Sequence, residues 1–341
     1  MLHFVGDINF TDGFFDTGFG IGSLIKKGFN PFEKFHFNAF DKYVGNFECV
    51  CSNDSNKEGV YRKQFIIEPD FLKCLTHFNI YSVANNHIMQ HGEMAFVNTL
   101  KNIEAFGSLH VGSLISKSIS FTHNHYSVGL LSFSYRPEKY SAEPKYWNSP
   151  DLAEIKHEFL NISSNDLKIA IIHWGNEFIN MPYSEQKIIG RGLIDMGFDL
   201  IVGIHPHVLQ GYEKYKNGYI FYSLGNFLFN MASDQTHYSA ILHIDMDKEK
   251  RLISKTEYIK LDKNGFPEII EECDVPNEYK FSHLNGLLKE NVENERYYSI
   301  VAENTKKYRK ANFALFLRSL PKFSLLDLRA ILIDFYLRRI R

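Results

Sequence analysis

Cysteine is scarce in this sequence. The four cysteines, Cys49, Cys51, Cys74 and Cys273, form neither a CxxC pair nor the spacing of a zinc ribbon. The sequence therefore offers no thiolate zinc motif. Such sparse cysteine use is typical of proteins from a reducing compartment.

Long hydrophobic runs and a signal peptide are also lacking. No run approaches the roughly 20 apolar residues that a membrane-spanning helix needs. The first residues, MLHFVGDINF, contain no basic region followed by a long apolar stretch. We therefore expect a cytoplasmic, soluble protein, with peripheral contact to a membrane surface as an open alternative.

A strong excess of one charge is absent as well. The 341 residues contain 38 Lys+Arg and 40 Asp+Glu, so the formal net charge of −2 gives no electrostatic case for a nucleic-acid partner. The charge is unevenly distributed, however. Residues 301–341 contain 10 Lys+Arg and 3 Asp+Glu, a net charge of +7, which leaves −9 for the remainder. The basic C-terminal segment therefore requires an explanation of its own.

Two catalytic motifs are missing. The phosphate loop GxxxxGK[ST] does not occur, so ATP use through that loop has no support. The serine-hydrolase elbow GxSxG does not occur either. Repeats, low-complexity segments and Pro/Gly-rich linkers are likewise absent. We therefore expect one catalytic-type domain, residues 1–275, followed by a basic helical extension, residues 276–341.

Short apolar runs alternate with segments of helical spacing. The runs have strand-like length and composition, and they comprise residues 2–5, 80–84, 126–134, 168–172 and 199–204. Helical spacing of apolar residues marks segments 93–106 and 184–196. The alternation predicts a layered α/β core. Three later runs, 219–229, 238–247 and 251–262, predict successive strands of a β-meander, and helix signals follow after about residue 275.

Polar side chains follow the predicted strands, which is where open α/β sheets place their chemistry. They are carboxylates, amides and imidazoles, namely Asp7, Asn9, Asn46, Glu48, Asn86, His87, His173, Glu177, His205 and His207. Mixed oxygen and nitrogen ligands suit one or two divalent ions such as Mn, Fe, Zn or Mg. Each residue alone has a bland interpretation as a turn, cap or core residue. Five clusters at five strand ends favour one shared metal site.

The stretch VGIHPHVLQG, residues 202–211, places two histidines around a proline. His205 and His207 follow directly after an apolar run. In an extended segment, residues two apart point the same way, so both imidazoles could approach one metal centre or two adjacent ones. The alternative is a solvated turn, because Gly203 and Pro206 interrupt the strand.

Six segments together resemble a known family. The segments GDINF, NFE, VANNH, HWGNEF, GIHPHVLQG and YSLGNFLF occur in the order and spacing of the CapA family. These are capsule and poly-γ-glutamate synthesis proteins within the calcineurin-like metallophosphoesterase superfamily. The resemblance covers roughly residues 1–245. It implies a four-layer α/β/β/α sandwich with a metal centre at the strand ends.

The resemblance also implies roles for individual residues. The implied metal ligands are Asp7, Glu48, Asn86, His173, His205 and His207. His87 is implied as the catalytic residue, which stabilises developing charge and protonates the leaving oxygen. The remaining candidates would contact substrate or orient ligands, or are merely turn amides and surface charges: Asn9, Asn46, Arg136, Glu177 and Asn226.

The implied activity is metal-dependent hydrolysis of a phosphate ester in the synthesis of capsule, exopolysaccharide or poly-γ-glutamate. The substrate would be a phosphorylated or polymer-linked small molecule. Several positions depart from the pattern: Asn9 replaces a histidine of the superfamily, and Gln90 and Asp12 replace an aspartate and an arginine usual in CapA-type proteins. These departures favour a rival hypothesis, a non-catalytic binding or assembly factor on the same fold. Acyl or amide-bond chemistry is a third alternative.

The C-terminal stretch FSLLDLRAILIDFYLRRIR, residues 323–341, predicts a helix with Ser324 as N-cap and Asp327 at the third position. Large apolar residues could share one face, with arginines elsewhere: Leu325, Leu328, Leu332, Phe335 and Tyr336, against Arg329, Arg338, Arg339 and Arg341. Such a helix either packs on the domain or lies on an anionic membrane surface.

Overall fold

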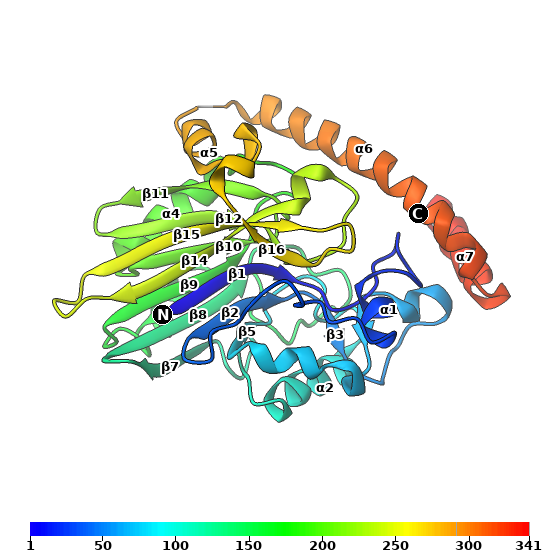
Figure 1. Cartoon of the computed structure of the whole chain (residues 1–341), viewed down its shortest axis with the longest axis horizontal. Coiled ribbons are helices and arrows are strands. Elements are labelled where there is room, and N and C mark those ends of the chain that lie inside the picture. Colours follow the sequence, from blue (N-terminus) through cyan, green and yellow to red (C-terminus); the bar gives the residue numbers. More distant parts are fainter. Residues whose placement is uncertain (291, 341) are drawn as a thin grey trace.

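The computed structural model of the chain describes residues 1–290 and 292–340, without the side chains of residues 334, 335 and 337–340. Phe335, Arg338, Arg339 and Arg341 of the predicted amphipathic helix therefore lie outside the described side chains. Two β-sheets form the centre of the molecule (Figure 1). None of the described helices has the length and apolarity needed to cross a membrane.

The first sheet contains eight strands in the order β16-β15-β14-β1-β2-β5-β6, with β13 also paired to β1. Its parallel part consists of β1 (Leu2–Ile8), β2 (Lys42–Phe47), β5 (Ile80–Ser82), β6 (Leu109–Val111) and β13 (Asn226–Leu228). Its antiparallel edge consists of β14 (Tyr238–Met246), β15 (Leu252–Leu261) and β16 (Pro267–Ile270).

The second sheet contains six strands in the order β11-β12-β10-β9-β8-β7. Its parallel strands are β8 (Tyr126–Ser134), β9 (Leu167–His173), β10 (Leu200–Ile204) and β12 (Gly218–Leu224). The antiparallel edges are β7 (Ser118–His123) and β11 (Leu209–Tyr215). A short pair, β3 (Val50–Cys51) and β4 (Ile66–Ile67), lies apart from both sheets.

The sheets and helices form four layers. Apolar side chains from both sheets, among them Phe4, Ile169 and Val202, meet in one core between the sheets. A second core joins the first sheet to α1 (Ile21–Lys26) and α2 (Glu93–Ala105), and a third joins the second sheet to α3 (Leu152–Phe159) and α4 (Ser184–Met196). Strands covered on both faces are apolar almost throughout, as β9 and β10 are. The predicted α/β/β/α sandwich is therefore confirmed.

The predicted meander requires a correction. Residues 219–229 do not form one strand beside 238–247, because they divide between β12 of the second sheet and β13 of the first. The chain changes sheets at Gly225, whose φ of +74° lies in the left-handed region that favours glycine. Only β14, β15 and β16 form an antiparallel meander. Apolar periodicity marks a strand but does not show which sheet the strand joins.

Three helices follow the last strand: α5 (Phe281–Leu287), α6 (Asn294–Ser319) and α7 (Leu325–Ile340). In Figure 1, α6 and α7 extend over the end of the molecule toward which β1 points. The predicted cap of α7 is present, because Ser324 Oγ accepts from the Asp327 amide (3.2 Å) and Asp327 Oδ2 accepts from the Ser324 amide (2.7 Å). This arrangement brings the basic extension to the end of the molecule that carries the polar strand ends.

Candidate metal centre

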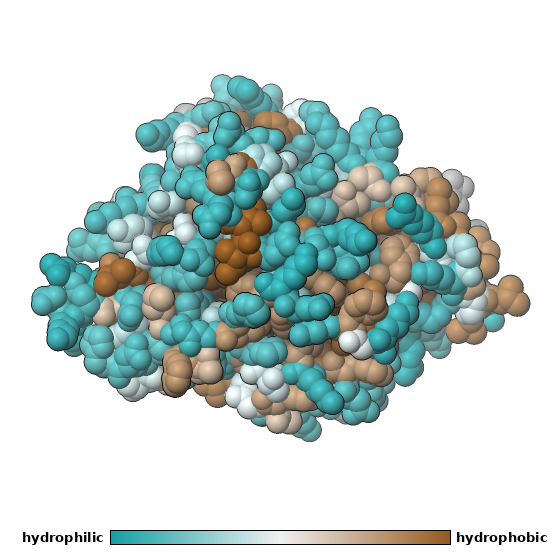
Figure 2. Space-filling model, in the orientation of Figure 1, coloured by the Kyte–Doolittle hydropathy of each residue, from teal (hydrophilic) through white to brown (hydrophobic). Residues whose placement is uncertain are grey.

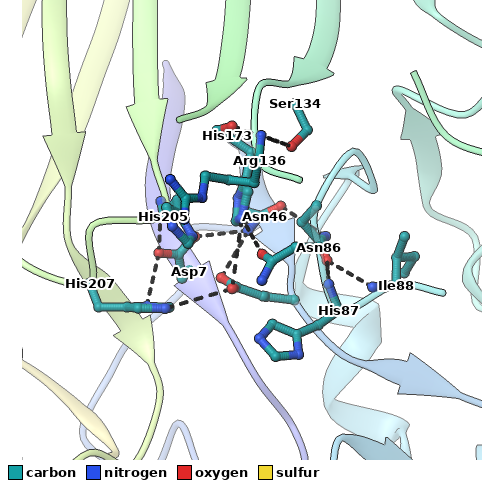
Figure 3. A network of polar contacts seen from close by, with 12 residues as sticks. Asp7, Asn46, Asn86, His87, Ile88, Ser134, Arg136, His173, His205 and His207 are labelled. Carbon is teal, nitrogen blue, oxygen red and sulfur yellow. Dashed lines mark hydrogen bonds and ion pairs between the residues drawn. The ribbon is translucent and has the colours of Figure 1, made fainter. Parts of the chain in front are cut away.

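Polar side chains from both sheets meet at the carboxyl ends of the strands (Figure 3). Asp7 lies in β1 and Asn46 in β2, while His173 is the last residue of β9. His205 and His207 follow β10, and Glu48 follows β2. All of these side chains are buried. Residues far apart in sequence thus share one site, because parallel strands of both sheets end at the same place.

Two sets of three ligand atoms can be drawn from this cluster. One ligand atom each of Glu48, His205 and His207 lies within 4.8 Å of the others, and the same holds for Asp7, Glu48 and His173. A metal ion with ligand bonds of about 2.0–2.2 Å brings its ligands to such separations. Glu48 belongs to both sets. Its carboxylate could therefore serve as a ligand in either set.

The unpaired polar atoms of the cluster fit a cation. Among the described residues, Glu48 Oε1 and both ring nitrogens of His205 are buried without a hydrogen-bond partner. Glu48 Oε1 lies 3.7 Å from His207 Nε2 and 3.9 Å from His173 Nε2, which is too far for hydrogen bonds. Buried polar atoms without partners are rare, and an ion that takes them as ligands removes the cost. The donor set of carboxylate and imidazole suits Mn, Fe or Zn.

The charges of the cluster support the same conclusion. Burial and the neighbouring Asp7 raise the pKa of Glu48 well above its ordinary value. Burial also lowers the pKa values of His173 and His205 well below the ordinary value. For Asp7, burial acts upward but is outweighed by His207, so its pKa is lowered. A divalent cation would compensate two carboxylates that otherwise repel each other.

Two amides orient the ligands. Asn46 Nδ2 donates to Asp7 Oδ1 (2.8 Å) and to Glu48 Oε2 (3.3 Å), so one side chain fixes both carboxylates. His207 Nδ1 donates to Asn226 Oδ1 (2.9 Å), which leaves Nε2 of that ring directed at Glu48. Asn226 is the register partner of Asp7 where β13 pairs with β1. Hydrogen bonds of this kind set the tautomer of a ligating histidine.

The loop after β5 contributes an amide and a histidine. Asn86 Oδ1 accepts from His173 Nε2 (2.7 Å), which places the amide oxygen at the ligand cluster. His87 lies beside it, with Nδ1 2.7 Å from Gln90 Oε1. Burial lowers the pKa of His87 to about 4, although the Gln90 contact and the charge of Glu177 act upward. His87 is half-buried, and its ring lies below the ligand cluster in Figure 3.

The histidine pair reaches the site by a turn and not by an extended segment, which corrects the geometric expectation. His205 has φ 97° and His207 has φ 60°, both in the left-handed region. Non-glycine residues held there carry strain, and such residues cluster at functional sites. The His205 amide donates to Asp7 Oδ2 (3.1 Å), so the strained backbone is tied to a ligand. Pro206 separates two imidazoles that both point into the cluster.

Three other predicted residues do not belong to either set of ligand atoms. Asn9 is buried, but its Oδ1 accepts from the backbone amide of Thr11 (3.0 Å) and from its hydroxyl (2.5 Å), so it holds a turn. Arg136 extends toward His205 in Figure 3, and its Nη1 donates to the carbonyl oxygen of Gly175 (2.5 Å). Glu177 is half-buried and acts on the cluster through its charge.

Sequence reasoning missed two kinds of residue. Asn85 Nδ2 donates to the Phe47 carbonyl (2.8 Å) and to Asn46 Oδ1 (3.3 Å), and its Oδ1 accepts from the His87 amide (3.1 Å). Its position before Asn86 and His87 was a sequence signal. The aromatic rings around the site gave no sequence signal. Phe65 stacks on His87 with ring centroids 4.1 Å apart, and Phe178 stacks on Tyr308 of α6 with ring centroids 3.9 Å apart.

Sequence comparison agrees with the geometry. The family model described as "Bacterial capsule synthesis protein PGA_cap" matches residues 1–231. The chain belongs to this family. Its CapA-type motifs are the segments that carry the ligand cluster described above. The family match ends before β14, so α5, α6 and α7 lie outside it.

Two curated CapA proteins are similar to the chain. The PGA biosynthesis protein CapA of Bacillus subtilis (strain 168) is 32% identical over 227 residues, which cover 62% of this chain and 59% of the relative. The capsule biosynthesis protein CapA of Bacillus anthracis is 30% identical over 183 residues, or 48% of this chain and 43% of the relative. The chain thus spans about half the length of the curated relatives that it matches.

Solved structures show a distant likeness in fold. A phosphatase from Mycoplasma pneumoniae aligns with a TM-score of 0.45 and 13% identity, covering 76% of this chain and 92% of that chain. The 5′-nucleotidase from Candida albicans SC5314 aligns with a TM-score of 0.46 and 13% identity, covering 91% of this chain and 57% of that chain.

Proposed function

We propose that this CapA-family protein is a metal-dependent phosphoric ester hydrolase that acts in the synthesis of capsule, exopolysaccharide or poly-γ-glutamate. One observation carries the proposal: Glu48 belongs to two sets of three buried ligand atoms, and partnerless atoms of Glu48 and His205 lie among them. The substrate would be a phosphorylated or polymer-linked small molecule in the cytoplasm, not a nucleic acid.

The ligands would be Asp7, Glu48, Asn86, His173, His205 and His207. When bound, one or two divalent ions would supply Lewis acidity toward a phosphoryl oxygen and lower the pKa of water. Arg136 carries a guanidinium that can bind phosphate oxygens, because its remaining N–H groups form a planar fork. The Gly175 contact holds this side chain over the ligand cluster.

His87 is the proposed catalytic residue. Its ring holds a proton at Nδ1, which donates to Gln90 Oε1, and its pKa of about 4 leaves it neutral at pH 7. The lone pair at Nε2 then suits acceptance of a hydrogen bond or proton better than protonation of a leaving oxygen. In this proposal His87 is an acceptor, whereas the family resemblance implied a proton donor.

The experiment is elemental analysis together with hydrolysis of bis-p-nitrophenyl phosphate, for the wild type and the Asp7→Ala/His205→Ala double variant. We expect near-stoichiometric divalent metal in the wild type, and its loss together with at least about a hundredfold drop in turnover in the double variant. His157→Ala, an exposed histidine of α3, is the matched control and should retain both. Turnover that survives the double substitution would refute the proposal.

A binding or assembly factor on the same fold is the second candidate. Two observations favour it: Asn9, at a superfamily ligand position, has its oxygen engaged by Thr11, and Gln90 replaces a usual carboxylate beside His87. Tight metal binding without turnover on mono- and diesters would select this candidate.

A further inference from the structure

A cavity of about 730 Å³ lies near the metal centre, because its lining residues Phe65 and Gln90 contact His87. Its walls include Phe14, Tyr61, Phe65, Gln90, Tyr140 and Ile333. Three of these residues also surround the proposed catalytic histidine. Phe65 stacks on the His87 ring (4.1 Å between centroids, 4° between planes), Gln90 Oε1 lies 2.7 Å from His87 Nδ1, and the Tyr140 ring centroid lies 6.4 Å away. The cavity therefore lies beside His87.

The backbone holds the Phe65 ring in this place. Phe65 has φ 55°, in the left-handed region, and its amide donates to the Asp12 carbonyl oxygen (2.8 Å). A bulky residue in that region is strained, and strain of this kind persists where a site requires it. The ring that lines the cavity beside His87 is therefore fixed by the fold.

The lining favours a flat group with polar edges. Four rings line the cavity, of which Phe14 already stacks on Tyr61 and Phe316. Amide side chains of Asn56, Gln64 and Gln90 and the charges of Lys57 and Glu58 add polar groups to the lining. A saturated hydrocarbon chain would desolvate the charges of Lys57 and Glu58 without offering them hydrogen bonds, which is costly. A volume of 300–1,000 Å³ is usual for a small-molecule site, so a ring system with an attached sugar fits this space.

Helix α7 forms the outer wall of the cavity through Ala330 and Ile333. The helix is held on the short 3-10 helix η1 (Gly59–Lys63) by close packing, because a Cβ at Gly59 would lie 2.9 Å from Ala330 Cβ. A partly buried ion pair adds to this contact, with Lys63 Nζ donating to Asp327 Oδ2 (2.5 Å). The C-terminal extension, which lies outside the family match, thereby completes the cavity.

We propose that this cavity binds the aromatic or heteroaromatic ring of the substrate, with the phosphate group at the ligand cluster and α7 as part of the binding site. The substrate class is a phosphate ester that carries such a ring, as in nucleoside phosphates. This inference rests on the proposed hydrolase function, which it makes more specific.

The test compares esters that share one leaving alcohol. Adenosine and uridine 5′-phosphates differ from ribose 5-phosphate only in the base, so a difference in kcat/KM measures the ring alone. We expect kcat/KM to be at least about tenfold higher for the nucleoside phosphates, since stacking on aromatic side chains contributes this much per base. Farnesyl phosphate tests a hydrocarbon chain without an aromatic ring and should show no such gain. Equal values for ribose 5-phosphate and the nucleoside phosphates, or a preference for farnesyl phosphate, would overturn the proposal.

Two variants locate the ring. Ile333→Asp and Tyr61→Ala should each reduce the ratio of kcat/KM for adenosine 5′-phosphate over ribose 5-phosphate. Leu332→Asp is the matched control on α7, because Leu332 is exposed and does not line the cavity. The substrate comparison uses the wild-type chain, so the proposal remains testable if a variant fails to fold.

Calorimetry separates this inference from the hydrolase proposal. Titration of adenosine 5′-phosphate into chelator-treated protein should show binding that Ile333→Asp weakens and Leu332→Asp does not. If no ester is hydrolysed, bis-p-nitrophenyl phosphate included, and this binding pattern is still seen, the cavity assignment stands and the hydrolase function fails. If esters are hydrolysed and no ring preference or ring binding is found, the cavity assignment alone is wrong.

Discussion

At the scale of single residues, the metal centre depends on amides that hold its ligands in place. Asn226→Ala would remove the nearer partner of His207 Nδ1, leave only Asp7 Oδ2 at 3.3 Å, and so loosen the orientation of the ring. We expect metal affinity to fall about 10–100-fold, as is usual when such an orienting partner is lost. Competition with a chelating dye measures the affinity. Asn161→Ala, on the surface beside α3, is the control, and unchanged affinity in the Asn226 variant would contradict this account.

A second residue-scale prediction concerns Asp16 in the loop after β1. Its carboxylate accepts from the Gly13 amide (2.6 Å) and from Asn230 Nδ2 (2.8 Å), yet burial and the nearby Asp12 raise its pKa from 3.8 to about 7. The folded state therefore binds this proton more tightly than the unfolded state. Its contribution to stability is complete below pH 4 and is lost as the pH rises through 7.

An asparagine at position 16 cannot ionise, so Asp16→Asn should remove this dependence of stability on pH. Between about pH 4 and pH 8, the free energy of unfolding of the wild type should fall by on the order of 2–4 kcal/mol relative to the variant. Urea unfolding at several pH values gives the difference, in which the other titrating groups cancel. Parallel pH profiles of wild type and variant would show that Asp16 titrates normally.

The sequence could predict the polar residues of the site and little of its surroundings. Asp7, His173 and His205 follow apolar runs, and a sheet brings strand ends together by its own geometry. Phe65 and Tyr308 could not be predicted, because irregular loops and a distant helix bring these rings to the site. The left-handed backbone conformation of His205 could not be predicted either, because Pro206 indicates a turn but not the φ angle of the residue before it.

At the scale of elements, the site strand β1 passes unusually close to the segment between β12 and β13. A Cβ at Gly6 would lie 1.7 Å from the Gly225 carbonyl oxygen, the atom that accepts from the Asp7 amide (3.0 Å). Gly6→Ala should therefore push β1 away and move Asp7 with it. We expect a loss of about 1–3 kcal/mol in stability and weaker metal binding.

Thermal unfolding and metal titration of the Gly6 variant check both effects. Gly192→Ala in α4 is the control, because a Cβ there meets nothing within 4 Å and should stabilise the helix slightly. If the Gly6 and Gly192 variants had equal stability and equal metal affinity, the close approach of β1 to Gly225 would be refuted.

Most elements could be predicted from periodicity, but their pairing could not. The helices expected at 93–106 and 184–196 correspond to α2 and α4, since apolar spacing reports directly on the buried face. The run 219–229, predicted as one strand, divides between two sheets, because the chain turns at Gly225. Pairing depends on contacts between residues far apart in the chain, which local patterns do not contain.

At the scale of the whole molecule, the extension joins a basic segment to an exposed apolar face. Leu325, Leu332 and Tyr336 of α7 are 87%, 67% and 65% exposed, and residues 301–341 carry a net charge of +7. Figure 2 shows apolar side chains gathered at the end of the molecule where α7 lies. An apolar helix face beside basic residues is complementary to a membrane surface that carries anionic lipid.

We therefore expect the intact chain to float with phosphatidylglycerol vesicles and not with phosphatidylcholine vesicles, and raised salt should weaken this binding. The Leu325→Asp/Leu332→Asp double variant should lose it, because the substitutions place charge on the face that would enter the interface. Ile115→Asp is the matched control, since Ile115 is 86% exposed but lies on a loop in the body of the fold. Equal flotation of all three proteins would mean that α7 serves the cavity alone. Loss of flotation in the double variant only would place the proposed phosphate-ester site beside a lipid surface, where substrates linked to lipid are found.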